Sequence, residues 1–233
     1  GALLAYPAFE FIRNDLCLQK QIVKIVGTGA GEIYSALGPT HHSTEDLGGL
    51  RSLPNLTIIT PASPMEVKKA TVAAYEYEGP VYLRLGTNKE AEIYEKDYIF
   101  EIGKGVVMRE GRDITLISLG TVVKDVLDVA EALDKEGINT RVINMHTVKP
   151  IDRELIMQAI DETGRIVTIE DQNIIGGLGS AVAEVIAEYG KGVTFKQMGL
   201  HNFSEGYGTY QQVKANNGID VPCIYNAVKK IMD

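Results

Sequence analysis

Short runs of branched apolar residues alternate along the chain with longer stretches whose apolar positions repeat every three or four residues. In the first half the runs predict strands at Ile22–Val26, Leu56–Thr60 and Val81–Leu85. The stretch before the third run has a strong helix start, with Ser63 as N-cap, Pro64 at the first helical position and Glu66 placed to close a capping box. We expect this helix to reach about Tyr77, and the strand–helix–strand order is typical of a parallel sheet.

From Asn88 to Arg112 the periodicity is lost, charge increases and several glycines occur, so we place the connection between two domains there. A second alternating series follows. Its predicted strands are Ile114–Ser118, Thr140–Asn144, Ile166–Ile169 and Val193–Met198, and its predicted helices are Val122–Lys135, Asp152–Glu162, Ser180–Tyr189 and Pro222–Met232. The pattern predicts an α/β protein of two domains, residues 1–100 and 101–233, each a mainly parallel sheet flanked by helices.

Charge and cysteine content narrow the class of protein. With 31 acidic and 23 basic residues the formal net charge is −8, and the scattered Lys and Arg argue against nucleic-acid binding. No apolar run approaches the roughly 20 residues that cross a bilayer, and the apolar start is too short for a signal sequence. Cys17 and Cys223 form no metal-binding pattern, so we expect reduced thiols in the cytoplasm, with one disulfide as the alternative.

Two glycine-rich segments invite a phosphate-binding interpretation. Gly27–Gly31 follows a predicted strand, but Glu32 stands where a dinucleotide-binding loop would need its third glycine. Gly176–Gly179 precedes a predicted helix, whose first amides could hold an anion. A tight loop explains the first segment and close packing the second, so neither identifies a ligand.

The loop Gly38–Asp46 carries the densest potential chemistry, because His41 and His42 stand beside Glu45 and Asp46 between two predicted strands. Histidine can donate to an oxyanion or exchange protons near neutral pH. One imidazole could instead cap a helix or bond within the core. A metal site is a further alternative, although neighbouring side chains diverge and no other ligand is spaced to complete the set.

Two further charged positions are notable. Arg84 interrupts an apolar predicted strand, so its guanidinium needs an anion, either a substrate carboxylate or phosphate or a structural Asp or Glu. Glu170 and Asp171 follow the predicted strand Ile166–Ile169 and reach the same edge of a sheet. A cation could bind there, or the two carboxylates could hold a neighbouring loop by hydrogen bonds.

Several segments together, in their order and spacing, carry a family resemblance. They are Gly38–His41, Thr44–Arg51, Asn55–Ser63, Gly79–Leu85, Ile114–Gly120, Val167–Asp171 and Ile175–Ser180. The sequence resembles the transketolase family over almost its whole length. The resemblance implies a partial pyrimidine-binding domain followed by the transketolase C-terminal domain, and a transferase of carbohydrate metabolism that uses thiamine diphosphate and Mg²⁺.

The resemblance also assigns expected roles to residues. His41 corresponds to the family's active-site histidine, which hydrogen-bonds the carbonyl or hydroxyl of the substrate. Arg84 corresponds to an arginine that meets the substrate's anionic tail, and His42 is a further substrate-binding candidate without a firm counterpart. The implied reaction transfers a two-carbon ketol unit from a ketose or ketose phosphate to an aldehyde acceptor.

Part of the family's machinery is missing from this sequence. No Gly-Asp-Gly occurs, although the family's separate diphosphate-binding and metal-binding domain carries that motif, and Glu10 does not stand where the family's activating glutamate does. The junction at Tyr6–Phe9 also looks shorter than the family's, and the chain opens without Met, so we expect residues upstream. We therefore expect a subunit or fragment that is inactive alone and needs a transketolase N-terminal partner, in a homodimer or heterotetramer.

Two departures and several alternatives qualify this hypothesis. Leu37 and Gly29 replace an aspartate and a histidine of sugar-phosphate transketolases, which leaves fewer donors for sugar hydroxyls and favours a specialised substrate. Alternatives within the superfamily are a 1-deoxyxylulose-5-phosphate synthase fragment and the β subunit of a 2-oxo-acid dehydrogenase. An alternative of another class is a noncatalytic assembly module that keeps the fold without the chemistry.

Overall fold

The computed structural model describes residues 1–87, 90–204 and 206–232, apart from the side chains of residues 2 and 3. Asn88, where the predicted connection begins, and Asp233, where the predicted second domain ends, lie outside the described residues. The strands are β1 Lys24–Gly27, β2 Thr57–Ile59, β3 Val81–Arg84, β4 Val106–Arg109, β5 Ile114–Ser118, β6 Thr140–Asn144, β7 Thr147–Lys149, β8 Arg165–Asn173 and β9 Thr194–Leu200. The α-helices are α1 Ala2–Ala5, α2 Phe9–Phe11, α3 Asp46–Arg51, α4 Pro64–Glu76, α5 Val123–Asp134, α6 Arg153–Thr163, α7 Leu178–Tyr189, α8 Tyr210–Asn216 and α9 Val221–Met232. A π-helix spans Ile12–Cys17, and 3-10 turns span Ser35–Leu37, Pro39–His41 and Gly120–Val122.

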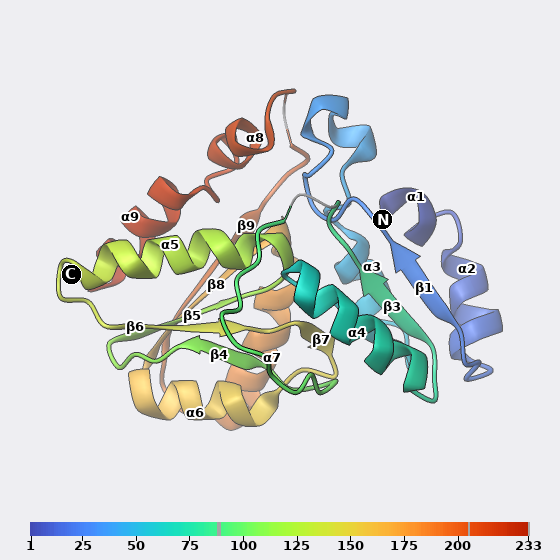
Figure 1. Ribbon diagram of the computed structural model, residues 1–233, viewed down its shortest axis with the longest axis horizontal. Coiled ribbons are helices and arrows are strands. Elements are labelled where there is room, and N and C mark those ends of the chain that lie inside the picture. Colours follow the sequence, from blue (N-terminus) through green and yellow to red (C-terminus); the bar gives the residue numbers. More distant parts are fainter. Residues whose placement is uncertain (88–89, 205, 233) are drawn as a thin grey trace.

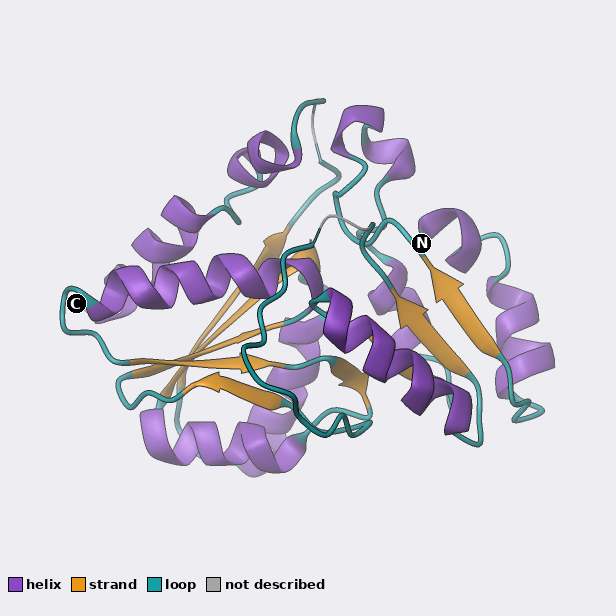
Figure 2. Ribbon diagram, viewed as in Figure 1, coloured by secondary structure: helices purple, strands orange, loops and turns teal. Residues whose placement is uncertain are grey.

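Two sheets form two units of the molecule, and helices flank each of them (Figure 1; Figure 2). The first sheet has the order β1-β3-β2-β7 and the second the order β4-β6-β5-β8-β9. The pairs β1–β3, β2–β3, β5–β6, β5–β8 and β8–β9 are parallel, whereas β7 and β4 join antiparallel to their neighbours. The predicted class, α/β with two mainly parallel sheets, is confirmed.

The strand β7 links the two units. It lies beyond the predicted boundary at residues 100 and 101, yet it pairs antiparallel with β2 in the first sheet. Neither β7 nor β4 was expected, because β4 lies in the segment where the apolar periodicity is lost and β7 follows directly after the predicted strand Thr140–Asn144. The division of the chain at residue 100 stays a prediction.

The start of α4 follows the predicted signal only in part. Ser63 caps the helix, since its Oγ accepts a hydrogen bond from the Glu66 amide at 3.3 Å, and Pro64 occupies the first turn. The prediction of a reciprocal capping-box bond is wrong: the Glu66 carboxylate accepts from the Ala62 amide at 2.5 Å instead of from Ser63. This carboxylate turns inward because polar groups from distant segments bond to it.

Glu66 connects three parts of the chain. Its fully buried carboxylate accepts hydrogen bonds from the hydroxyls of Tyr94 at 2.6 Å and Tyr98 at 2.5 Å, and from the Asn144 amide nitrogen at 3.0 Å. Tyr94 and Tyr98 belong to the irregular segment between the units, and Asn144 ends β6. One carboxylate of α4 therefore fastens the connecting segment against the second unit.

The main apolar core runs through both units without a break. On the first unit it includes Ile12, Leu47, Leu50, Ile58 and Tyr82, and on the second Ile143, Met145, Ile156, Leu178 and Val182. A separate cluster packs α5 and α9 against the other face of the second sheet, and a smaller one packs α4 on the first. Because the large cluster is shared, each unit covers apolar surface of the other.

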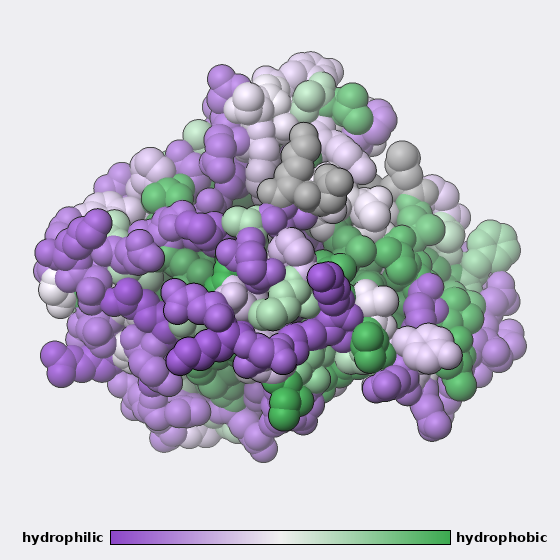
Figure 3. Space-filling view, in the orientation of Figure 1, coloured by the Kyte–Doolittle hydropathy of each residue, from purple (hydrophilic) through white to green (hydrophobic). Residues whose placement is uncertain are grey.

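The surface shows where apolar side chains remain uncovered. Figure 3 shows hydrophobic atoms on the side that carries β1 and the N-terminal helices. Large apolar residues that are well exposed in this region are Phe11, Leu18, Ile22 and Val26. The strand β1 stands at the end of its sheet, with β3 as its neighbour among the described strands. An exposed apolar strip beside an edge strand is typical of a surface that pairs with another chain.

We expect Glu66→Ala to destabilise the protein by about 2–4 kcal/mol, because it leaves several buried donors without an acceptor. Urea denaturation followed by circular dichroism measures the change. Glu76→Ala, an exposed position at the other end of α4, is the control and should shift the midpoint little. Equal effects of the two substitutions would contradict the role of Glu66 as a fastening point.

Candidate active site

The carboxyl ends of strands from both sheets meet around one side chain, Asp171 near the end of β8. Its carboxylate accepts from Arg84 at the end of β3, at 3.3 Å, and from Thr121 in the turn after β5, at 3.0 Å. Tyr210 at the start of α8 donates to it at 3.1 Å. Gly31, in the loop after β1, approaches so closely that a Cβ there would lie 2.0 Å from Asp171 Oδ2. This edge of parallel strands is where α/β proteins bind ligands.

The loop with His41 projects from this edge. Gly38 precedes the turn Pro39–His41 with a φ of 77°, a conformation that favours glycine. A Cβ there would also lie 2.3 Å from the ring of the exposed Tyr207, which would have to move. The His41 imidazole is exposed, and its Nδ1 lies 3.1 Å from Thr40 Oγ1. Thr40 therefore lies beside Nδ1, and Nε2 is at the opposite side of the ring from this contact.

His42, unlike His41, lies in the interior. Its side chain is buried, and neither ring nitrogen has a hydrogen-bond partner among the described residues. Burial lowers the pKa of His42, the adjacent His41 lowers it further, and the Tyr34 backbone opposes the shift. The lowered pKa favours the neutral ring, and the two neighbouring imidazoles differ in that one is buried and the other exposed. Within the described residues no group of three or more His, Cys, Asp or Glu could hold a metal ion.

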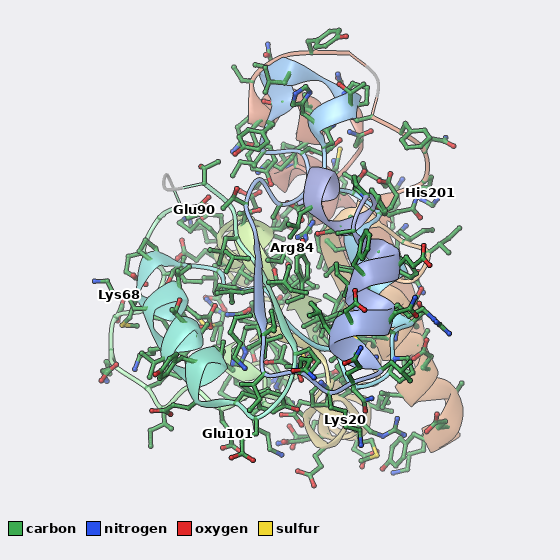
Figure 4. The ribbon with its side chains drawn as sticks, turned by 90° about the vertical axis from the view of Figure 1, so that its right-hand side faces the viewer. Lys20, Lys68, Arg84, Glu90, Glu101 and His201 are labelled. Carbon is green, nitrogen blue, oxygen red and sulfur yellow. The ribbon has the colours of Figure 1, made fainter. Side chains whose placement is uncertain are left out.

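Arg84 lies in the interior of the molecule, as Figure 4 shows by contrast with the peripheral Lys20, Lys68 and Glu101. Its side chain is fully buried. The guanidinium donates from Nε to Asp46 at 3.0 Å and from Nη2 to the Ser43 carbonyl at 2.9 Å.

Two residues of β8 complete the surroundings of Arg84. Asp171 accepts from Nη1 at 3.3 Å, and Gln172 Oε1 accepts from Nη2 at 3.1 Å. Burial acts to lower the pKa of Arg84, but the charges of Asp46 and Asp171 outweigh it and raise the pKa. Structural carboxylates thus stand against the guanidinium, and a contact with the substrate stays a prediction.

Glu170 fills the place that an anion could take at the start of α7. Its carboxylate accepts from the amides of Leu178 at 2.7 Å and Gly179 at 2.8 Å. Burial raises the pKa of Glu170 to about 7, although these two amides act in the opposite direction. The glycine-rich segment Gly176–Gly179 therefore binds a carboxylate of its own chain.

Glu32 is a fully buried acid at the position where a dinucleotide-binding loop would need its third glycine. Its Oε1 accepts from the Asn217 side chain at 2.6 Å, whereas Oε2 has no hydrogen-bond partner. Burial raises the pKa of Glu32 to about 7 and the Asp171 charge adds to the shift, whereas the neighbouring Ser204 and Asn217 side chains oppose it. The signal in the sequence for this buried acid was a glutamate among glycines beside the end of a strand. The sequence could not show its hydrogen bond with Asn217, because the two residues are 185 positions apart.

The two departures from the family pattern lie in the same loop region. Gly29 has a φ of 75°, and a Cβ there would lie 2.0 Å from the Tyr34 ring, so a larger residue would need the ring to move. Leu37 is exposed, immediately before Gly38. Neither position offers a hydrogen-bond donor from its side chain.

A cavity of about 500 Å³ lies between the units near this loop, and its lining includes Tyr34, Thr121, Tyr210 and Lys214. His41 is not one of its lining residues. The exposed imidazole of His41 therefore lies outside this cavity.

Family models match both halves of the chain. The model described as transketolase, pyrimidine binding domain, matches residues 4–90, and the model described as transketolase, C-terminal domain, matches residues 103–224. The chain belongs to the transketolase family, and the resemblance seen in its motifs is confirmed.

Individual similar proteins are also named as transketolases. An apulose-4-phosphate transketolase subunit of Actinobacillus succinogenes is 37% identical over 220 residues, which are 93% of this chain and 70% of that protein. A putative transketolase C-terminal section of Methanocaldococcus jannaschii is 37% identical over 228 residues, 97% of this chain and 70% of that one. A solved split-gene transketolase, described as an inactive beta4 tetramer, has 39% identity and a TM-score of 0.91 over 99% of this chain and 73% of its own.

Glu32 predicts a pH dependence of stability. Its pKa is raised to about 7 in the folded protein, above the usual value of about 4.3. Between these two pH values the folded protein holds a proton that the unfolded chain has lost. The contribution of protonated Glu32 to the free energy of unfolding is therefore complete below about pH 4.3 and is lost as the pH rises through 7.

We expect Glu32→Gln to remove this part of the pH dependence of stability. Between pH 5 and pH 8 the free energy of unfolding of the variant should rise by about 1–3 kcal/mol relative to that of the wild type. Urea denaturation at several pH values measures it. The exposed Glu188→Gln serves as control. Parallel pH profiles for the wild type and Glu32→Gln would rule out a raised pKa at this residue.

Proposed function

We propose that this chain is the C-terminal subunit of a thiamine-diphosphate-dependent transketolase-type enzyme. It transfers a two-carbon ketol unit from a ketose or ketose phosphate to an aldehyde acceptor, together with a partner that carries the diphosphate and Mg²⁺ site. The observation that carries the proposal is the exposed His41 on a loop at the carboxyl edge of parallel strands, in a chain that both transketolase family models match.

The need for a partner is supported by what the chain offers. Members of this family depend on thiamine diphosphate. The sequence contains no Gly-Asp-Gly, and the described residues contain no cluster of three acidic, His or Cys side chains that would suit Mg²⁺. The donor set of a diphosphate and metal site therefore does not fit this chain alone, and we assign that site to the partner.

The surfaces support the same assembly. His41 is exposed, and a second surface laid over its loop would exclude water from the reacting groups. Phe11, Leu18 and Ile22 are likewise exposed beside β1. A relative named as a subunit, from Actinobacillus succinogenes, fits a split enzyme. We propose a homodimer or heterotetramer in the cytoplasm, where the free thiols Cys17 and Cys223 remain reduced.

In the assembled enzyme His41 would contact the substrate. Thiamine diphosphate supplies the nucleophilic carbon for transfers of this kind. Our chain contributes the imidazole, whose Nε2 can donate to the oxygen of a substrate carbonyl or hydroxyl while Thr40 lies against Nδ1. We expect a preorganised donor there to stabilise charge that develops on that oxygen.

The substrate is proposed only as a class. Gly29 and Leu37 provide no side-chain donors, so we expect a sugar with fewer hydroxyls to satisfy at this side of the site. The chain is also similar to 1-deoxy-D-xylulose-5-phosphate synthases, so decarboxylation of a 2-oxo acid is the alternative within the superfamily. His42 is retained as a weaker substrate-binding candidate that would have to rotate outward, since it is buried.

A noncatalytic assembly module is the second candidate function. The solved split-gene transketolase with a TM-score of 0.91 is described as an inactive beta4 tetramer. If this chain likewise forms an inactive assembly, its function would be to assemble without catalysing a reaction. The two candidates differ in whether a partner restores cofactor binding.

We expect thiamine diphosphate with Mg²⁺ to bind, and ketol transfer to appear, only when the chain is mixed with the product of the neighbouring gene. Isothermal titration calorimetry of the chain alone and of the mixture measures binding. A coupled assay with ketose donors and aldehyde acceptors measures transfer. Absence of binding under both conditions would favour the assembly module and reject the enzyme.

We expect His41→Ala to lower turnover of the assembled enzyme by about 10²-fold, because a polarising group is lost at the reacting oxygen. The fold should be unaffected, since the side chain is exposed. Turnover and thermal unfolding are measured on the same preparation, with the exposed His201→Ala as control. Wild-type turnover in His41→Ala would remove this residue from the site.

A further inference from the structure

The second unit holds the backbone directly behind His41. The Asn173 amide, at the end of β8, donates to the Thr44 carbonyl at 2.7 Å. Just before it, Ser43 and Gly31 exchange two backbone hydrogen bonds, at 2.8 and 3.1 Å, in an isolated antiparallel bridge. The exposed end of the loop is thus free to meet a substrate, while its base is fixed two residues away.

Arg84 adds a side-chain connection between the same two places. Its Nη2 donates both to the Ser43 carbonyl and to Gln172 Oε1, and its Nη1 donates to Asp171. Its Nε donates to Asp46, the first residue of α3, on the other side of the loop. One planar guanidinium therefore joins the base of the His41 loop to consecutive residues of β8.

The contacts of Arg84 with β8 lie at the edge of the second sheet where the strand order reverses. The chain runs from β5 to β6 on one side of β5 and returns to β8 on the other side, so the strand order reverses between β5 and β8. A crevice at such a reversal is the usual ligand site of an open α/β sheet. Here Asp171 stands at the reversal and receives Arg84 from the first unit, with Gly31 packed against its carboxylate.

We propose that Arg84 is a positioning residue, which holds the His41 loop against Asp171 and Gln172 of the second unit and makes no contact with the substrate. The inference rests on the proposed function for its catalytic consequence, but not for its geometry. Arg84 is 1% exposed, and its Nε, Nη1 and Nη2 atoms all donate to protein acceptors. A substrate anion would have to displace two carboxylates of the chain itself.

The shape of the guanidinium explains why arginine stands here. Its donors point in fixed, divergent directions and can serve Asp46, Asp171, Gln172 and a carbonyl at once. A lysine keeps the charge but presents one compact ammonium, so Arg84→Lys should satisfy one carboxylate and release the Ser43 carbonyl. This variant preserves charge balance in the interior and separates loop positioning from simple neutralisation.

Hydrogen exchange measured by mass spectrometry on the chain alone tests the geometry. In Arg84→Lys we expect the amides of residues 40–46 to exchange at least about tenfold faster, while the strands of the second sheet keep their protection. Gln172→Leu, which removes one neutral acceptor, should give a smaller change in the same direction and remains informative if Arg84→Lys does not fold.

Glu184→Gln is the matched control. Glu184 on α7 pairs with Arg51 of α3 at 2.6 Å, so the substitution also weakens a contact between the two units, but away from the His41 loop. It should leave the exchange of residues 40–46 unchanged. Equal acceleration in the control and in the Arg84 and Gln172 variants, or none in any of them, would overturn the proposal.

Kinetics of the enzyme assembled with its partner test the effect of Arg84 on catalysis. Fructose 6-phosphate and fructose serve as donors. A positioning residue predicts that Arg84→Lys lowers kcat by about tenfold or more for both donors, with little change in KM. A rise in KM confined to the phosphorylated donor would instead make Arg84 a substrate ligand and overturn the proposal. If even the wild-type assembly is inactive, the proposed function fails while the exchange experiment still decides the role of Arg84.

Discussion

The buried charge of Arg84 is the constraint on which the arrangement of the two units depends. A guanidinium removed from water is costly unless carboxylates and hydrogen bonds replace its hydration. Asp46 comes from the first unit and Asp171 from the second, so neither unit alone provides both anionic partners. Tyr82 donates to Asp46 at 2.8 Å, and Thr121 and Tyr210 donate to Asp171. The cluster is complete only when the units are docked.

Apolar packing supplies the bulk of the attraction behind this polar cluster. The largest core continues from the first unit into α6 and α7, and burial of such surface is the dominant favourable term in folding. Polar contacts then define the register: Arg51 of α3 forms two hydrogen bonds with Glu184 of α7 and a third with the Gly176 carbonyl. Packing alone is non-directional, whereas these hydrogen bonds specify one orientation of α3 against α7.

The same docking organises the candidate site. Glu170 occupies the amides at the start of α7, and Asp171 faces Arg84, so the acidic pair at the end of β8 serves internal contacts. His41, by contrast, is exposed, on the loop that these contacts hold. In this arrangement the second unit contacts the backbone of the His41 loop, since the Asn173 amide donates to the Thr44 carbonyl.

The sequence by itself determined the α/β class, most strands and long helices and the loop that carries His41, because each follows from local periodicity or from a run of adjacent residues. It also determined the family, because several such runs occur in a specific order and spacing. It did not decide between a substrate and a structural partner for Arg84, and it contained no sign that β7 joins the first sheet or that Glu32 meets Asn217. Those features depend on residues far apart in the chain. Whether a charge is buried, and against what, is decided only when the two units pack together.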